Sequence, residues 1–133
     1  MIKFGKSFTE KFKTHSDAAL KSLFDNFIKP IKDGVPIEEL PGKYKPSWEV
    51  PDFGTKMQHA FRKVSQDKNL HHYHIGYRRY YPGKDPVYRG MESEGISHIM
   101  ILSPGHPQPD THVILRLDEK HPSPFTVPMD FEF

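Results

Sequence analysis

The carboxy-terminal half of the sequence contains a succession of short apolar or alternating runs, and this pattern constrains the fold more than any other feature. Each run is bounded by Gly, Pro, Asn or Asp, as strands commonly are. The runs cover residues 59–64, 70–77, 97–102 and 111–118. The connections 65–69 and 103–110 are short enough to join antiparallel neighbours, whereas 78–96 is a longer loop. We therefore expect an antiparallel sheet in this half of the chain.

The amino-terminal part predicts one strand and two helices. The first residues, MIKF, alternate apolar and polar side chains. The spacing of Ser7 and Glu10 is that of a capping box and predicts a first helix. A second helix is expected after Ser16, because apolar residues recur on one helical face as far as Ile31, and Gly34 is a natural stop. The predicted fold class is α+β, with the strand and two helices packed on one face of a four- to five-stranded antiparallel sheet.

Length and composition favour a single domain that spans residues 1–133. A chain of 133 residues can bury one core and is too short to suggest two. The absence of cysteine excludes disulfides and thiolate metal sites and suits a reducing cytosol. The charged start lacks the apolar run of a signal peptide, and no stretch approaches the roughly 18 apolar residues of a membrane span. We expect a cytoplasmic protein that does not enter the membrane.

Positive charge is concentrated in the middle of the chain. Residues 43–90 hold ten Lys/Arg and four Asp/Glu, whereas residues 91–133 hold two and seven. A localised basic segment favours an anionic partner, and nucleic acid is the commonest one. The alternative is a solvated loop that is simply rich in lysine.

The alternation of side chains along the predicted strands places histidines on one face of the sheet. Val113, Leu115 and Leu117 would form an apolar face, because successive side chains of a strand point to opposite sides. The opposite face, away from the helices, would then carry His72, His74, His98, His112 and Arg116.

Three interpretations of this polar face remain open. A metal site needs three or four converging ligands, but no HxxxH, HExxH or cysteine accompanies the histidines, so no metal or cofactor is predicted. The face could also be an ordinary polar surface of an open sheet. Finally, imidazoles beside an arginine could transfer protons and stabilise phosphate during RNA cleavage.

Two segments of the sequence resemble a known family. The stretch LFDNFIKPIKDGVPIEELPGKYKPSW, followed by HHYHIGY, is similar to the YafO-type mRNA interferases. These belong to the RelE/ParE superfamily of toxins from bacterial type II toxin–antitoxin systems, which the predicted order of elements also resembles. The shared features are a helix that ends in a Lys-Asp-Gly-Val-like stop, a Gly-Lys plus aromatic loop, and a His-x-His strand. The resemblance covers residues 1–77, and the carboxy-terminal third departs from the pattern.

The resemblance implies a small, metal-independent endoribonuclease that cuts mRNA on the ribosome, needs no cofactor and is neutralised by a cognate antitoxin protein. The expected catalytic residues are His72 and His74 as acid or base, Arg79 and Arg116 at the phosphate, and His121 after the last strand. Basic and aromatic side chains, including the YRRYY stretch, suit single-stranded RNA. The expected RNA contacts are Lys43, Lys45, Arg62, Lys63, Arg78, Tyr80, Tyr81, His98 and His112.

Two alternatives to this enzyme stay open at the level of sequence. The chain could bind RNA or the ribosome without cutting, or it could be a metal-dependent enzyme that uses the histidine cluster. The sequence gives no indication of the oligomeric state.

Overall fold

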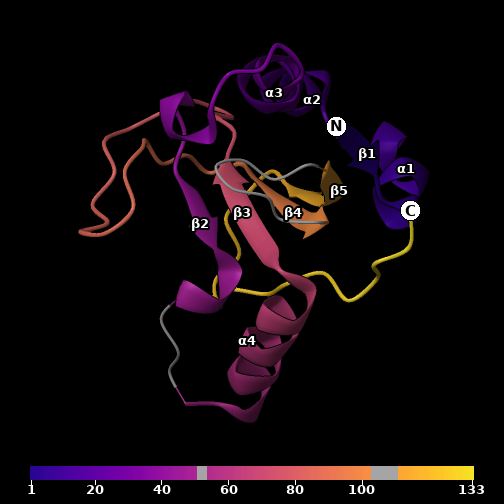
Figure 1. The fold of residues 1–133 in the computed structure, drawn as a ribbon, viewed down its shortest axis with the longest axis vertical. Helices are drawn as coiled ribbons and strands as arrows, with labels where there is room; N and C mark the ends of the chain where they lie inside the picture. The colour runs from indigo at the N-terminus through magenta and orange to yellow at the C-terminus, as the bar shows by residue number, and fades with distance from the viewer. Residues whose placement is uncertain (51–53, 103–110) are drawn as a thin grey trace.

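One five-stranded sheet organises the part of the chain that the computed structural model describes, which is residues 1–50, 54–102 and 111–133 (Figure 1). The strand order is β1-β5-β4-β3-β2. Neighbouring strands are antiparallel except for β1, which runs parallel to β5. The strands are β1 (Ile2–Phe4), β2 (Tyr44–Pro46), β3 (Leu70–His74), β4 (Ile96–Leu102) and β5 (Thr111–Asp118). The predicted α+β class is confirmed, and the sheet is antiparallel in every pair but one.

Helices follow β1 as predicted, but three α-helices form in place of the expected two. The helices are α1 (Lys6–Glu10), α2 (Asp17–Leu23) and α3 (Lys29–Lys32). The predicted capping box at Ser7 is wrong, because Ser7 already lies inside the first helix, whose N-cap is Gly5 with no side-chain cap. The Ser16 hydroxyl caps α2 by accepting a hydrogen bond from the Ala19 backbone N–H at 3.2 Å. A π-helical turn, Phe24–Ile28, joins α2 to α3 just before Pro30. Proline has no N–H for a regular helical bond, and a π-helical turn accommodates such a local break in the bonding pattern.

Residues 59–64 were expected to form a strand, and this prediction is wrong. They lie inside α4 (Lys56–Lys68), which begins with a capping box at Thr55 and ends where Asn69 adopts a left-handed conformation with φ of 54°. Within the six-residue run, the apolar residues Phe61 and Val64 are three positions apart and pack together against the sheet. A run of six residues fits both the helical and the strand period, so the capping residues on either side of it decide between a helix and a strand.

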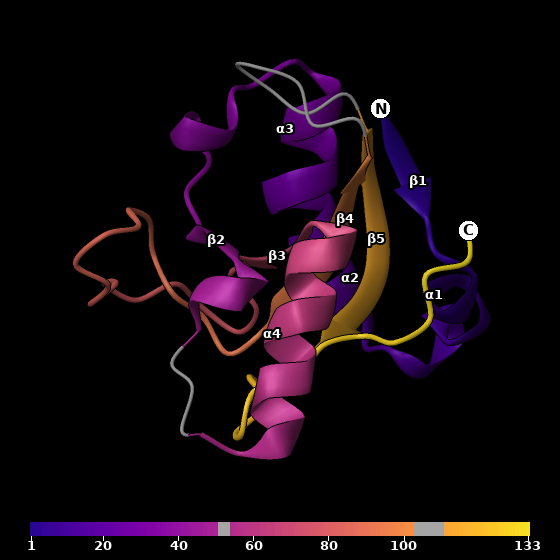
Figure 2. The same cartoon turned by 60° about the horizontal axis from the view of Figure 1, so that its bottom comes forward.

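Two apolar cores lie on opposite faces of the sheet. The amino-terminal helices cover the first face, as predicted, and α4 covers the second (Figures 1 and 2). The first core includes Phe27, Tyr73, Ile99, Ile114 and Leu117. The second includes Leu70, Met100, Val113, Leu115 and Val127. The predicted connection 103–110 lies outside the described residues.

A β-bulge in β5 changes which side chains share a face. The pairing passes from His98 with Arg116 to Ile99 with Ile114, which leaves Leu115 as the extra residue. Leu115 and Arg116 therefore both lie on the α4 side, and the alternation is reversed on the far side of the bulge. The prediction that Leu117 shares a face with Val113 and Leu115 is wrong, because Leu117 packs in the first core and the other two in the second.

The face of the sheet that carries His72, His74 and His98 is covered by the chain and is not open to solvent. His72, His74 and His98 are only 2%, 3% and 1% exposed. The carboxy-terminal segment, residues 119–133, crosses this face and places the Phe125 ring 4.8 Å from the His72 ring. The predicted open polar surface is therefore wrong, because an irregular segment that shows no periodicity in the sequence covers the histidines. In the described part of the chain, no helix is both long and apolar enough to cross a membrane.

The bulge also separates His112 from the other histidines, so the prediction that it shares their face is wrong. His112 packs on the side of the amino-terminal helices, with its ring 5.5 Å from the Phe27 ring and 6.2 Å from the Tyr44 ring. The side chain is buried, and neither ring nitrogen has a hydrogen-bond partner among the described residues. Burial lowers the pKa of His112 to about 4, so the ring is neutral at pH 7.

We expect His112→Leu to raise the free energy of unfolding by about 1–3 kcal/mol at pH 7, because the native imidazole loses its hydration on folding without gaining a partner. Urea unfolding of the variant beside the wild type measures this. His98→Leu is the matched control, since it removes a buried ring that is hydrogen-bonded to Asp118 at 2.8 Å and should be destabilising. A His112→Leu protein that is less stable than the wild type would contradict the assignment.

Candidate functional site

Three histidines meet at a pocket of about 300 Å³ on the β2–β3 side of the sheet. Its walls come from β2 and the residue before it, from β3, from the loop 77–95 and from the carboxy-terminal segment. We call it the histidine pocket; its lining is Lys43, Lys45, Val50, His72, His74, Tyr81, Glu92 and His121. Six of these eight residues were predicted as site residues from the sequence. Segments that are distant in the sequence therefore converge as the hypothesis of an active site requires.

The imidazole rings lie next to one another along one wall. The ring centroids of His72 and His74 are 6.2 Å apart, as expected for neighbours on one face of β3. His121 stacks on His74, with 5.7 Å between the centroids. The Nδ1 atom of His72 lies 3.0 Å from the hydroxyl oxygen of Ser47, which fixes the orientation of that ring.

His74 has a hydrogen-bond partner in either protonation state of Nδ1. The backbone N–H of Ser93 lies 2.9 Å from this nitrogen and donates to it when Nδ1 carries no proton. The backbone carbonyl of Ser93 is also 2.9 Å away and accepts from Nδ1 when it is protonated. A ring that is satisfied both with and without the proton is suited to general acid–base catalysis.

Burial sets the charge of the two strand histidines. It lowers the pKa of His72 well below the usual value, and the neighbouring histidines and Lys43 act in the same direction. It also lowers the pKa of His74 to about 4, although the backbone of Ser93 opposes the shift. Both rings are therefore neutral at pH 7 and can accept a proton.

The lysines of the pocket are paired with carboxylates. The Lys43 ammonium lies 2.7 Å from Glu92 and 3.5 Å from Asp85, and that of Lys45 lies 2.7 Å from Asp85. Burial acts to raise the pKa of Glu92, but the hydrogen bond and charge of Lys43 outweigh it, so the pKa lies below the usual value. The hydrogen bond from Lys45 is the main cause of a strongly lowered pKa at Asp85. The charges of the four groups cancel, so the pocket is less basic than the sequence suggested.

Several predicted RNA-binding residues, and the predicted catalytic residue Arg79, lie outside the pocket. Arg62 and Lys63 are exposed on α4, and Arg78 and Arg79 are exposed after β3. Tyr80 does not present its ring as a free platform, because its hydroxyl donates to the carbonyl oxygen of His74 at 2.8 Å. The structure therefore separates these residues from the histidines.

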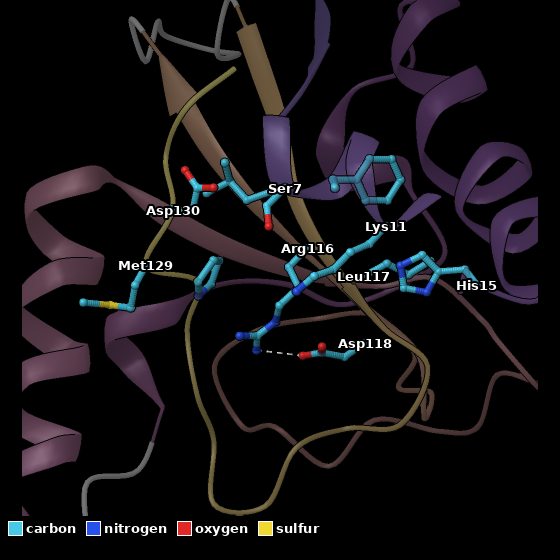
Figure 3. A pocket seen from close by; sticks show the side chains of 11 residues that line it. Ser7, Lys11, His15, Arg116, Leu117, Asp118, Met129 and Asp130 are labelled. Atoms are coloured by element: carbon cyan, nitrogen blue, oxygen red, sulfur yellow. Dashed lines mark hydrogen bonds and ion pairs between the residues drawn. The ribbon is translucent and has the colours of Figure 1, made fainter. Parts of the chain in front are cut away.

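His98 and Arg116 form a second polar cluster with Asp118. Figure 3 shows the Arg116 and Asp118 side chains of this cluster and the bond between them. The Asp118 carboxylate lies 2.8 Å from His98 Nε2 and 2.8 Å from the Arg116 guanidinium. Arg116 also donates to the hydroxyl of Thr126 at 2.9 Å and thereby ties the carboxy-terminal segment to β5. A cavity of about 310 Å³ beside this cluster is lined in part by Lys11. Neither His98 nor Arg116 lines the histidine pocket.

We expect Arg116→Met to lower the free energy of unfolding by about 1–3 kcal/mol, because Asp118 and Thr126 lose a partner at a partly buried site. Chemical unfolding measures the loss. Arg62→Met, on the exposed face of α4, is the control and should change stability by less than about 0.5 kcal/mol. Equal stability of the Arg116→Met variant and the wild type would show that the guanidinium does not anchor the segment.

Several residues that shape the pocket could not be predicted from the sequence. Asp85 and Glu92 lie 40 and 49 residues from the lysines they pair with. Ser47 begins a short 3₁₀ helix, and Ser93 and Phe125 sit in irregular segments. No local spacing relates them to the histidines. No group of three or more His, Asp or Glu side chains within the described ranges is arranged to hold a metal ion.

Comparisons with known proteins returned no match: no family model, no curated protein and no solved structure matches the chain. The fold and the site therefore define this molecule as an α+β protein with a histidine pocket under its carboxy-terminal segment.

Proposed function

We propose that this protein is a metal-independent endoribonuclease that cleaves mRNA at the histidine pocket by general acid–base chemistry. The observation that carries the proposal is the convergence of His72, His74 and His121 with Lys43 at one pocket. Cleavage by a 2′-hydroxyl needs a base, an acid and a cation near the phosphate, and this lining offers all three.

His74 is the proposed base. Its neutral ring takes the proton of the 2′-hydroxyl, and the resulting oxyanion attacks the adjacent phosphorus. The bond from phosphorus to the 5′ oxygen breaks, and His121, which is stacked on His74, gives a proton to that oxygen. The products are a 2′,3′-cyclic phosphate and a 5′-hydroxyl. Lys43 stabilises the charge that develops on the phosphoryl oxygens.

The biological setting of the proposal comes from the resemblance to the YafO-type interferases. We propose a type II toxin that acts in the cytoplasm, cuts mRNA on the ribosome and is held inactive by a cognate antitoxin. Arg78 and Arg79, which are exposed in the segment that follows β3, are suited to contact the RNA backbone.

One observation favours a second candidate function, a module that binds RNA or the ribosome without cleavage. The lysines of the pocket are neutralised by carboxylates, whereas Arg62, Lys63, Arg78 and Arg79 are exposed outside it. A surface of this kind binds phosphate without any need for the imidazoles.

The test is an RNA cleavage assay with purified protein that has been dialysed against EDTA, performed with and without ribosomes. We expect fragments with 2′,3′-cyclic phosphate ends and no cleavage where the 2′-hydroxyl is replaced by hydrogen. Intact RNA that is bound by the protein would favour the binding module. Activity that is lost on dialysis and restored by a divalent metal would favour the metal-dependent alternative.

A further inference from the structure

Two lysines of the histidine pocket converge on one carboxylate oxygen. The Oδ2 atom of Asp85 lies 2.7 Å from the Lys45 ammonium and 3.5 Å from the Lys43 ammonium. The side chains are largely withdrawn from water, with 8% of Lys43, 14% of Lys45 and 8% of Asp85 exposed. Two ammonium groups that share one oxygen form a ready site for an anion, because charge-assisted hydrogen bonds of this kind are strong.

Asp85 belongs to the loop 77–95, which protrudes from the rest of the chain (Figure 1). It precedes the bend at 86–88, which we call the tip of the loop. The base of the loop 77–95 is fixed by backbone hydrogen bonds between Tyr81 and Glu92. Beyond the base the chain is largely exposed, and Val87 reaches 77% exposure. The Oδ1 atom of Asp85 accepts from the backbone N–H groups of Val87 at 2.9 Å and Tyr88 at 3.1 Å. One oxygen of Asp85 thus shapes the tip, while the other holds it against the lysines.

We propose that the space between Lys43 and Lys45 is a phosphate-binding site, that Asp85 occupies it as an internal anion, and that a phosphodiester of RNA displaces this carboxylate. The inference rests on the proposed function, since RNA cleavage is what places a phosphodiester beside these lysines. Both lysines line the same pocket as His74 and His121, so a phosphate bound there lies next to the proposed base and acid.

The competition explains how a pocket with paired lysines can bind a polyanion. Glu92 remains 2.7 Å from Lys43, so Lys45 is the ammonium that departure of Asp85 frees most. The ring of Tyr88, which follows Asp85 in the same loop, also lies 5.6 Å from the Lys45 ammonium. Asp85 therefore keeps the site closed to weak anions and opens it to a ligand that contacts both lysines.

Asp85→Asn tests this inference, because asparagine keeps the oxygen that shapes the tip and removes the charge. We expect inorganic phosphate to bind the variant at least about tenfold more tightly than the wild type, since a carboxylate in contact with the same ammonium groups no longer competes. Isothermal titration calorimetry at pH 7 measures both affinities. Asp33→Asn is the matched control: it removes a carboxylate 2.8 Å from Lys29 on the exposed surface of α3 and should change nothing. Unchanged or weaker phosphate binding by Asp85→Asn overturns the inference.

A second variant ties the gain to the proposed site. Lys45→Gln in the Asp85→Asn background should abolish the gain, and a gain that persists without Lys45 overturns the inference. The RNA assay separates this inference from the proposed function. Tighter phosphate binding with no RNA cleavage by either protein supports the anion site and refutes the nuclease. RNA cleavage by the wild type with unaltered phosphate affinity in Asp85→Asn supports the nuclease and refutes the anion site.

Discussion

Replacing His74 by asparagine is expected to lower the rate of RNA cleavage by about 10² to 10⁴, the usual effect of losing a general base. The pKa of His74, which burial lowers to about 4, keeps the ring neutral, and its Nδ1 atom has Ser93 as a partner both with and without a proton. Asparagine is polar and of similar size, but it cannot accept the proton of a 2′-hydroxyl. The measurement is single-turnover cleavage of a short RNA at pH 7.

His71→Asn is the matched control for this experiment. His71 belongs to the same strand, and burial lowers its pKa to about 4 as well. Its ring, however, packs against Tyr44 and Trp48, at 5.1 Å and 5.3 Å, and does not line the pocket. Thermal unfolding confirms that both variants are folded. Equal loss of activity in the two variants would indicate a structural effect, and full activity of a folded His74→Asn protein would refute the assignment of His74 as base.

The elements that the sequence predicted well are those with long or capped patterns. The apolar face that follows Ser16 continues for several helical turns, and the runs at 97–102 and 111–118 are flanked by turn residues, so each has several concordant signals. Residues 59–64 had only a short alternation. Their helical character depends on a capping box and a left-handed residue outside the run. A local pattern therefore predicts an element well when the residues at its ends indicate the same type of element as its apolar period.

The site was predictable in part because neighbours on a strand stay neighbours in the fold. His72 and His74 lie two residues apart on β3 and share a face in any sheet. It was harder to predict which residues of the other strands share this face, because one bulge at Leu115 places His112 on the opposite side of the sheet. The covering segment and the carboxylate partners come from irregular parts of the chain. Their positions depend on tertiary packing, which no sequence period encodes.

Acidification is expected to unfold this protein between about pH 6 and pH 4, because its buried histidines are neutral in the folded state. The pKa values of His74 and His112 are lowered to about 4 by burial, against about 6.5 in an unfolded chain. Between these values the unfolded chain binds more protons than the folded one, so the free energy of unfolding falls as the pH falls. Each histidine contributes about 1.4 kcal/mol per pH unit, and the lowered pKa values of His72 and His98 act in the same direction. The loss summed over these histidines is large compared with the free energy of unfolding of an ordinary domain, about 5–15 kcal/mol.

Urea unfolding at a series of pH values from 7.5 to 4.5 measures the slope, and two variants attribute it to particular rings. His112→Leu should reduce the slope by about 1.4 kcal/mol per pH unit and leave RNA cleavage unchanged, because His112 lies on the other face of the sheet from the pocket. His74→Asn should reduce the slope by a similar amount and also lower the rate of cleavage by about 10² to 10⁴. A stability that stays constant from pH 7 to pH 5 would mean that the folded chain takes up these protons readily. In that case burial does not lower the pKa values of these histidines in the folded protein, and the expected acid unfolding is refuted.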